Sequence, residues 1–155
     1  MKLTTLCYII KDGKWLMLHR TKKETDENAG KWIGVGGKLE KGESPENCLY
    51  REVLEETGLK IKKHDFRGVV TFISDIWDDE MMFLYTAEVC DGIIKECDEG
   101  ELKWIEGKDI LSLNLWEGDR IFLGLLAQGA PFFSLKLSYS GDKLLAAELD
   151  GKEYI

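Results

Sequence analysis

Three glutamates, Glu52, Glu55 and Glu56, lie close together in a segment predicted to be helical. At about 100° per residue they share one face of that helix. Carboxylate oxygens with no cysteine or histidine nearby are the ligands that Mg²⁺ and Mn²⁺ prefer. Such a cation neutralises phosphate oxygens and lowers the pKa of an attacking water. The residue types therefore suggest metal-dependent phosphate chemistry, although a solvated acidic helix face has the same pattern.

The helix that carries these acids has recognisable ends. Ser44, Pro45 and Glu46 form a typical start, because serine caps a free amide, proline pre-sets φ and glutamate favours the positive end of the helix dipole. Gly58 provides the matching stop. Between these ends the periodicity predicts a core face opposite the acids, made of Leu49, Tyr50, Val53 and Leu54.

The acids also belong to a longer ordered pattern, G-x5-E-x7-R-E-U-x-E-E-x-G-U, in which U is apolar. Every position of the pattern is filled, by Gly37, Glu43, Arg51, Glu52, Val53, Glu55, Glu56, Gly58 and Leu59. This pattern is the Nudix box, and the chain resembles the Nudix hydrolases. The resemblance implies a mixed sheet between helices and metal-dependent hydrolysis of a nucleoside diphosphate linked to another group.

The resemblance also assigns roles within the box. The expected metal ligands are carboxylates and one main-chain carbonyl of the preceding turn: Glu52, Glu55, Glu56, Glu99 and either Gly36 or Gly37. Glu52 is expected to deprotonate or orient the water, with Arg51 holding the carboxylates in place through charge-assisted hydrogen bonds. Glu99 resembles the remote acid that many relatives contribute, although an ordinary acidic turn has the same composition.

Residues beside the box are candidates for binding the substrate phosphates. Lys38 follows the expected metal turn, and Arg20 ends a predicted strand at the same edge, where a cation can hold a polyphosphate. We expect Arg20, Gly37 and Lys38 to contact the substrate, although a surface cation is the commoner explanation for Arg20 alone. Glu43 either helps to place metal or water or completes the loop before the helix.

Outside the box, the stretches Gly30–Lys38 and Trp116–Asp119 resemble the MutT-type oxidised purine nucleoside triphosphatases. The likeness is closest to the small mutator-preventing enzymes of Gram-positive bacteria, through Leu16–Arg20, Pro131–Ser134 and Gly141–Leu145. Such enzymes convert 8-oxo-dGTP to 8-oxo-dGMP and pyrophosphate, which keeps the damaged nucleotide out of DNA and so avoids mutation. The resemblance therefore implies nucleotide-pool sanitising with Mg²⁺, for which Mn²⁺ can substitute.

The resemblance gives three candidates for contact with the base. Trp116 would stack on the purine and Asp119 would accept a hydrogen bond from its edge, with Trp32 nearby. Each has an ordinary alternative: a core aromatic for Trp116, a helix cap for Asp119 and packing beneath the metal turn for Trp32. The mammalian enzyme has an asparagine at Ile33 and an acidic pair at Gly118-Asp119, so base selectivity here is built differently or is looser.

Two other functions use the same box. One is a Nudix enzyme for a different substrate, such as an ordinary dNTP, ADP-ribose or a dinucleoside polyphosphate, because specificity lies in the flanking loops. The other is a non-catalytic Nudix scaffold that binds nucleotides. The intact glutamates of the box argue against the scaffold.

The remaining sequence predicts one α+β domain over residues 1–155, with a mixed sheet sandwiched between helices and peripheral hairpins. Asp12-Gly13 predicts a tight turn between two strands, and a polar stretch from Thr21 to Lys31 predicts an exposed loop. The expected strands are Leu3–Ile10, Trp15–Arg20, Phe66–Ile73, Met81–Val89, Leu102–Ile105, Phe132–Tyr139 and Leu144–Leu149. A second helix is expected over Asp119–Gln128.

Composition excludes several classes of protein. The chain has 155 residues, with 21 basic and 29 acidic side chains and a net charge of −8, which disfavours binding to nucleic acid or to anionic membranes. Four cysteines without C-x-x-C spacing predict reduced and mostly buried thiols, with no zinc site or disulfide framework. We expect a cytoplasmic protein, monomer or homodimer, whose partner is a small nucleotide.

The net charge is unevenly placed along the chain. From Lys11 to Lys41 there are eight basic and five acidic residues, 8 − 5 = +3, and from Asp78 to Asp109 three and eleven, 3 − 11 = −8. The basic stretch contains the expected phosphate contacts, and the acidic one contains Glu99. This partition permits a small anion that arrives with its own divalent cation.

Overall fold

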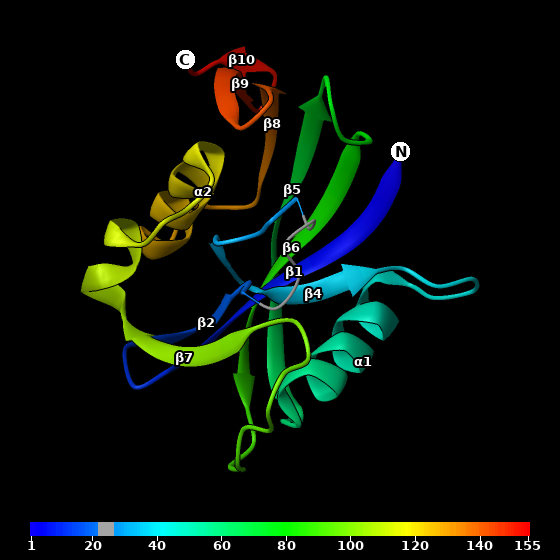
Figure 1. The fold of residues 1–155 in the computed structure, drawn as a ribbon, viewed down its shortest axis with the longest axis vertical. Helices are drawn as coiled ribbons and strands as arrows, with labels where there is room; N and C mark the ends of the chain where they lie inside the picture. Colours follow the sequence, from blue (N-terminus) through cyan, green and yellow to red (C-terminus); the bar gives the residue numbers. More distant parts are fainter. Residues whose placement is uncertain (22–26) are drawn as a thin grey trace.

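A computed structural model describes residues 1–21 and 27–155. The expected loop over residues 21–31 therefore lies partly outside the described residues. The elements in chain order are β1 (Lys2–Lys11), β2 (Lys14–His19), β3 (Trp32–Ile33), β4 (Val35–Lys38), α1 (Pro45–Thr57), β5 (Ile61–Ser74), β6 (Glu80–Val89), β7 (Glu101–Glu106), η1 (Gly107–Ser112), α2 (Glu117–Ala127), β8 (Phe133–Ser140), β9 (Lys143–Leu149) and β10 (Lys152–Glu153). Figure 1 shows their arrangement, in which the strands form one mixed sheet.

Strand β1 is the centre of that sheet. It pairs in parallel with β6 and antiparallel with both β2 and β4, and the strand order is β10-β9-β8-β5-β6-β1-β2-β3, with β4 on β1 and β7 on β2. The parallel pairing of β1 with β6 joins segments far apart in sequence. It brings the N-terminal residues next to the beginning of β6.

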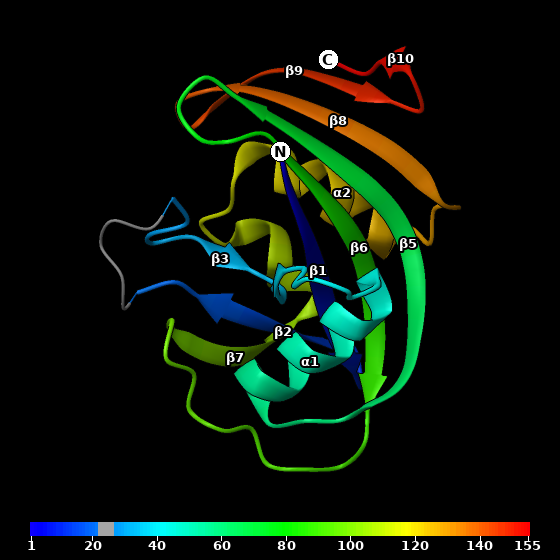
Figure 2. The ribbon, with the colours of Figure 1, turned by 90° about the vertical axis from the view of Figure 1, so that its right-hand side faces the viewer.

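The core has two layers, one on each face of the sheet. Alternate residues of β1 point to opposite faces, so Leu6 and Tyr8 pack in the layer beneath α2, whereas Cys7 and Ile9 pack in the layer beneath α1. Figure 2 shows α1 in front of the sheet and α2 behind it. The predicted α+β architecture, a mixed sheet between helices, is confirmed.

Local turn and cap signals are observed as predicted. Asp12 and Gly13 have φ of 52° and 76°, as a tight hairpin between β1 and β2 requires. At the start of α1, the Ser44 hydroxyl oxygen accepts a hydrogen bond from the backbone N–H of Asn47, and the Asn47 side-chain oxygen accepts one from the backbone N–H of Ser44. Gly58 ends the helix with a φ of 76°. These caps fix where α1 begins and therefore which of its residues face the sheet.

The prediction for the core face of α1 was partly wrong. Leu49 and Val53 are buried as expected, but Tyr50 and Leu54 are 42% and 47% exposed. The helix is oriented so that Glu56, one of the acids predicted to lie opposite the core face, is directed inward. The reason is that α1 packs against β4 as well as β1, and the glycines of β4 leave room for side chains that an ordinary strand would exclude.

Other boundaries differ from the sequence expectations by a few residues or more. Strand β5 begins at Ile61 rather than Phe66, and α2 begins at Glu117 rather than Asp119. Cys90 is exposed and the other three cysteines are buried, all of them as free thiols, as predicted. Among the described residues no helix is long and apolar enough to cross a membrane.

Candidate active site

Two glycines of strand β4 lie in close contact with its neighbours, Gly36 with β1 and Gly37 with α1. A Cβ on Gly36 would lie 2.0 Å from the backbone carbonyl oxygen of Thr5 in β1. A Cβ on Gly37 would lie 2.6 Å from the Glu52 carboxylate. The sequence predicted a metal-binding turn here, but both glycines lie in strand β4, where Gly37 is held directly against an acid of the box.

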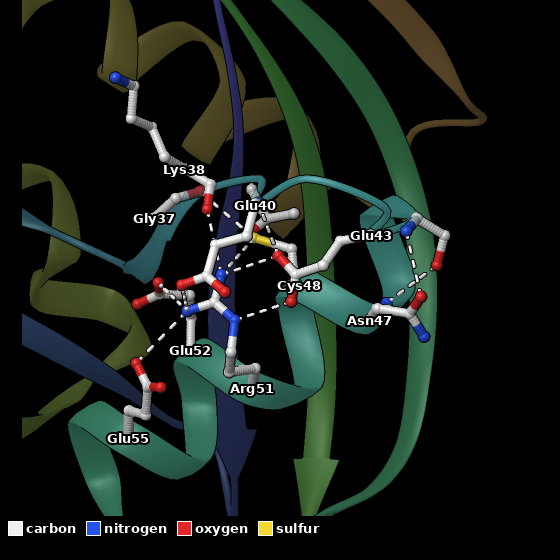
Figure 3. A network of polar contacts seen from close by, with 11 residues as sticks. Gly37, Lys38, Glu40, Glu43, Asn47, Cys48, Arg51, Glu52 and Glu55 are labelled. Atoms are coloured by element: carbon white, nitrogen blue, oxygen red, sulfur yellow. Dashed lines mark hydrogen bonds and ion pairs between the residues drawn. The ribbon is translucent and has the colours of Figure 1, made fainter.

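Arg51 organises the acids beside β4, as Figure 3 shows. Its Nε and Nη2 donate to the two carboxylate oxygens of Glu43 at 2.7 and 2.8 Å. Its Nη1 donates to Glu52 at 2.6 Å and to Glu55 at 3.3 Å, and Nη2 also donates to the Lys38 carbonyl at 3.1 Å. One guanidinium thus ties the loop before α1 to two acids of the helix.

Glu43 is fully engaged in this arrangement. Hydrogen bonds from Arg51 and from the Glu40 amide lower the pKa of Glu43 to about 2. Of the two roles considered for Glu43, completion of the loop is the one that these contacts favour. Its carboxylate fixes Arg51, which in turn fixes Glu52.

Glu56 is the most unusual acid of the box. Burial, followed by the nearby charges of Glu99 and Glu52, raises the pKa of Glu56 to about 9. Its Oε2 is buried and finds no hydrogen-bond partner among the described residues. A buried carboxylate oxygen without a partner, next to two further acids, is the environment that a divalent cation stabilises, since the cation supplies the missing charge and contact.

The acids are close neighbours without being closed around one point. In the described part of the chain, no group of three or more Asp, Glu, His or Cys side chains is already arranged to hold a metal ion. Glu52 is turned to Arg51, and the Glu55 side chain is 60% exposed. Glu52 and Glu55 thus take an arginine contact, whereas Glu56 stays buried beside the charges of Glu52 and Glu99. The donor set of glutamate and carbonyl oxygens fits Mg²⁺ or Mn²⁺.

Two of the predicted residues from outside the box are brought together. Arg20 Nη1 forms an ion pair of 3.1 Å with Glu99 Oε2, and the Arg20 side chain is only 14% exposed. The Lys38 side chain is exposed and extends away from the Arg51 cluster in Figure 3. The expected phosphate contact Arg20 is thus joined to the expected remote acid.

A cavity of about 400 Å³ connects this region to α2. On the side of α1 it is lined by residues of β4 and by the buried acid, namely Gly36, Gly37, Lys38 and Glu56, together with Arg20. On the side of α2 it is lined by aromatic, apolar and acidic side chains: Phe72, Met82, Glu80, Trp116 and Asp119. The volume is within the range of small-molecule sites.

Trp116 is both a packed aromatic residue and a wall of the cavity. Its ring makes edge contacts with Phe72 and Tyr139, at centroid distances of 6.0 and 5.4 Å, and its Nε1 donates to Asn28 at 2.8 Å. The Lys31 ammonium lies 5.4 Å from the ring centroid. These contacts hold the indole in one orientation on the cavity wall.

Asp119 is buried in the first turn of α2, three residues after Trp116, which occupies the N-cap position. Its alternative role as a helix cap is therefore not observed. Burial, reinforced by the charge of Glu80, raises the pKa of Asp119 to about 8, although Lys31 and Arg120 oppose the shift. At neutral pH a carboxyl group with this pKa is largely protonated, so it can donate as well as accept a hydrogen bond.

Trp32 is not among the residues that line the cavity. It stacks on His19, with the ring centroids 4.3 Å apart and the planes within 4°. Sequence reasoning also missed Phe72, Met82 and Glu80 as cavity residues, because they come from β5 and β6, which read only as ordinary strands. Side chains alternate between the two faces of a strand, so the sequence indicates that Glu80 and Met82 share a face. Which face of the sheet that is depends on pairing with distant strands.

The chain was compared with known proteins. The model of the NUDIX domain matches residues 2–126. The uncharacterized Nudix hydrolase YvcI of Bacillus subtilis is 33% identical over 152 residues, covering 94% of this chain and 92% of the relative. The oxidized purine nucleoside triphosphate hydrolase of Danio rerio is 30% identical over 154 residues, covering 98% and 96%.

A solved structure agrees with these sequence relatives. The crystal structure of a mutator MutT protein from Bacillus halodurans superimposes with a TM-score of 0.86 at 26% identity, covering 98% of this chain and 99% of that one. The fold, the filled box and the sequence matches together define a Nudix hydrolase. The chain belongs to the NUDIX family, whose members act on small nucleotide substrates and generally use divalent metal ions.

Proposed function

We propose that this chain hydrolyses oxidised purine nucleoside triphosphates with Mg²⁺, converting 8-oxo-dGTP to 8-oxo-dGMP and pyrophosphate. The observation that carries the proposal is a cavity that joins the glycines of β4 and Glu56 to Trp116 and Asp119. A nucleotide needs this combination of groups. Its phosphates require basic side chains and a metal ion held by carboxylates, whereas its base requires an apolar wall with a few polar groups.

At the phosphate end, the proposed metal ligands are carboxylates and one main-chain carbonyl. They are Glu52, Glu55, Glu56, Glu99 and the carbonyl of Gly36 or Gly37 in β4. When bound, Mg²⁺ would neutralise phosphate oxygens and lower the pKa of the attacking water. Glu52 would orient that water or accept its proton, since Arg51 fixes its carboxylate against Gly37. Arg20 and Lys38 would hold the polyphosphate, which leaves as pyrophosphate when the P–O bond of the attacked inner phosphorus breaks.

At the base end, Trp116 would provide an aromatic surface and Asp119 the hydrogen bonds to the purine edge. A neutral Asp119 both donates and accepts, which suits an edge where an N–H lies beside a carbonyl or a ring nitrogen. A site built to pair polar groups rejects bases that leave those groups unpaired, with discrimination up to about 10⁴-fold. Asp119 is nearly buried, so an unpaired contact there is costly.

The proposal is tested by kinetics on a substrate panel with Mg²⁺ and identification of the products by chromatography. The panel holds 8-oxo-dGTP, dGTP, ADP-ribose and a dinucleoside tetraphosphate. We expect kcat/KM for 8-oxo-dGTP to exceed that for dGTP at least about tenfold, a difference of roughly 1.4 kcal/mol, with pyrophosphate as product. A preference for ADP-ribose or the dinucleotide would overturn the assignment, and release of inorganic phosphate would overturn the cleavage position.

A matched pair of variants makes the assay specific for this site. Glu56→Gln removes a proposed metal ligand at the cavity and should abolish most hydrolysis, which exposes any contaminating phosphatase. Glu88→Gln makes the same substitution at an exposed residue of β6 outside the cavity and should behave as wild type.

A further inference from the structure

Cys48, near the beginning of α1, is a buried thiol that the proposed mechanism does not use. Its Sγ donates to the Gly37 carbonyl oxygen at 3.4 Å and lies 3.3 Å from the Thr5 hydroxyl oxygen. Arg51 Nη2 donates to the same sulfur at 3.8 Å. Figure 3 shows the sulfur turned toward Gly37 beside the guanidinium. One side chain of α1 therefore contacts β1, β4 and the arginine of the box.

These contacts set the direction in which the thiol donates. A thiol has a single hydrogen, and a carbonyl oxygen can only accept. With the Cys48 hydrogen on the Gly37 carbonyl, the Thr5 hydroxyl is left to donate to the sulfur. The result is a chain of hydrogen bonds from the Thr5 O–H through the Cys48 S–H to the Gly37 C=O. Cys48 and Thr5 are both buried, so solvent does not compete for these bonds.

The Gly37 carbonyl belongs to the part of β4 on which the proposed metal site depends. The proposed main-chain ligand is the carbonyl of Gly36 or Gly37, and a Cβ on Gly37 would lie 2.6 Å from the Glu52 carboxylate. The next carbonyl, that of Lys38, accepts from Arg51 at 3.1 Å. Two consecutive carbonyls of β4 are therefore held by side chains that lie three positions apart on one face of α1.

We propose that Cys48 is a positioning residue for the metal site: its thiol holds the Gly37 carbonyl and so fixes β4 against the acids of α1. The inference rests on the metal-binding role that the proposed function gives to this strand. A carbonyl oxygen has two lone pairs, so it can accept the thiol and still face a cation. The thiol therefore acts in the same way whether Gly36 or Gly37 supplies the metal ligand.

Strand β4 needs such a restraint because its own sequence restrains it little. It has four residues, two of them glycine, which has the largest conformational freedom to lose on folding. Arg51 also holds the strand, but it serves Glu43 and Glu52 as well, so a cation that attracts the acids of the box disturbs its contacts. The bonds of Cys48 to Thr5 and Gly37 involve no acid of the box and persist when the metal binds.

The first readout is the affinity for Mn²⁺ without nucleotide, measured from the electron paramagnetic resonance signal of the free ion. Cys48→Ala removes the donor, whereas Cys48→Ser keeps one. Cys7→Ala is the matched control, because it removes an equally buried thiol from the apolar layer beneath α1. We expect Cys48→Ala to raise the Kd for Mn²⁺ at least about threefold, and the other two variants to stay within about twofold of wild type.

Three results of this titration would overturn the inference. An unchanged Kd in Cys48→Ala would mean that the thiol does not act on the metal site. An equal rise in Cys48→Ser would mean that the hydrogen-bond donor is not what matters. An equal rise in Cys7→Ala would mean that loss of packing beneath α1 explains the effect.

The second readout is the ¹³C chemical shift of the Gly37 carbonyl in the metal-free full-length chain. A carbonyl that loses a hydrogen bond shifts upfield, so we expect an upfield shift in Cys48→Ala and recovery toward the wild-type value in Cys48→Ser. Thr5→Val leaves the thiol in place but removes its donor, so it should give a smaller shift in the same direction. Thr5→Val decides the matter if Cys48→Ala does not fold, and an unchanged Gly37 signal in a folded variant of either residue would contradict the chain of hydrogen bonds.

Failure of this inference and failure of the proposed function are distinguishable. Both readouts are independent of the nucleotide, so a panel that shows no preference for oxidised purines would refute the proposed substrate and leave the inference standing. Mn²⁺ binding that is unaffected by Glu56→Gln would refute the metal site on which both rest. If Glu56→Gln weakens Mn²⁺ binding and Cys48→Ala does not, the inference alone is wrong.

Discussion

Replacing Asp119 by asparagine should remove a pH dependence from the stability of this protein. The pKa of Asp119 is raised from 3.8 to about 8, chiefly by burial, and the residue is only 7% exposed. Between these two pH values the folded chain holds a proton that the unfolded chain releases. The stabilisation is therefore complete below pH 4 and is lost as the pH rises toward 8.

The size of the effect follows from the same linkage. Each pH unit within this window costs the wild type about 1.4 kcal/mol of unfolding free energy through this one group. From pH 5 to pH 7 the wild type should lose about 3 kcal/mol relative to Asp119→Asn, which has no proton to release. Subtracting the unfolding free energy of one protein from that of the other cancels the contribution of other titrating acids, such as Glu56, that the substitution leaves unaffected.

The measurement is urea unfolding of wild type and Asp119→Asn at pH 5, 6, 7 and 8, with Mg²⁺ at a fixed concentration. The difference in unfolding free energy should change steadily in favour of the variant as the pH rises. Parallel stability curves, with a difference that is the same at every pH, would refute the reasoning, because they would mean that Asp119 has an ordinary pKa in the fold.

Three further substitutions test the phosphate end of the cavity. Glu56→Gln should lower kcat at least about 10²-fold at saturating Mg²⁺ without unfolding the chain, and full activity would remove the metal role of that acid. Gly36→Ala places a methyl group 2.0 Å from the Thr5 carbonyl oxygen, so scanning calorimetry should show the melting temperature lowered by at least about 5 °C. Gly37→Ala meets the Glu52 carboxylate, the movable end of a side chain, at 2.6 Å; it should lower kcat at least about tenfold with a smaller thermal shift, and equal thermal shifts for the two alanines would contradict this distinction.

Local signals in the sequence predicted the local structure well. The ends of α1 follow from Ser44 and Gly58, and the hairpin between β1 and β2 follows from Asp12-Gly13, because each depends on the conformation of a few adjacent residues. The spacing of the box predicted that its glutamates would lie on one helix, and they lie on α1. These features require no knowledge of distant contacts.

Features that depend on distant contacts could not be predicted in the same way. Helical periodicity placed Leu54 on the core face and Glu56 on the opposite face, but burial is decided by what packs against the helix, and here that includes a strand with two glycines. Glu80 enters the cavity because β6 pairs in parallel with β1, which places it beside Thr4. Nothing within either segment alone specifies that pairing.

The uneven charge along the chain acquires a structural meaning at the ion pair of Arg20 with Glu99. Arg20 belongs to the basic stretch and Glu99 to the acidic one, and antiparallel pairing of β2 with β7 brings the two stretches side by side. Both members of the pair are largely buried, so the pair would separate only where each member gains another partner. A triphosphate bound with a divalent cation offers a partner to each member, since phosphate oxygens suit the guanidinium and the cation suits the carboxylate. A net charge of −8 is therefore compatible with an anionic substrate, because the opposite charges are arranged in adjacent places rather than averaged over the surface.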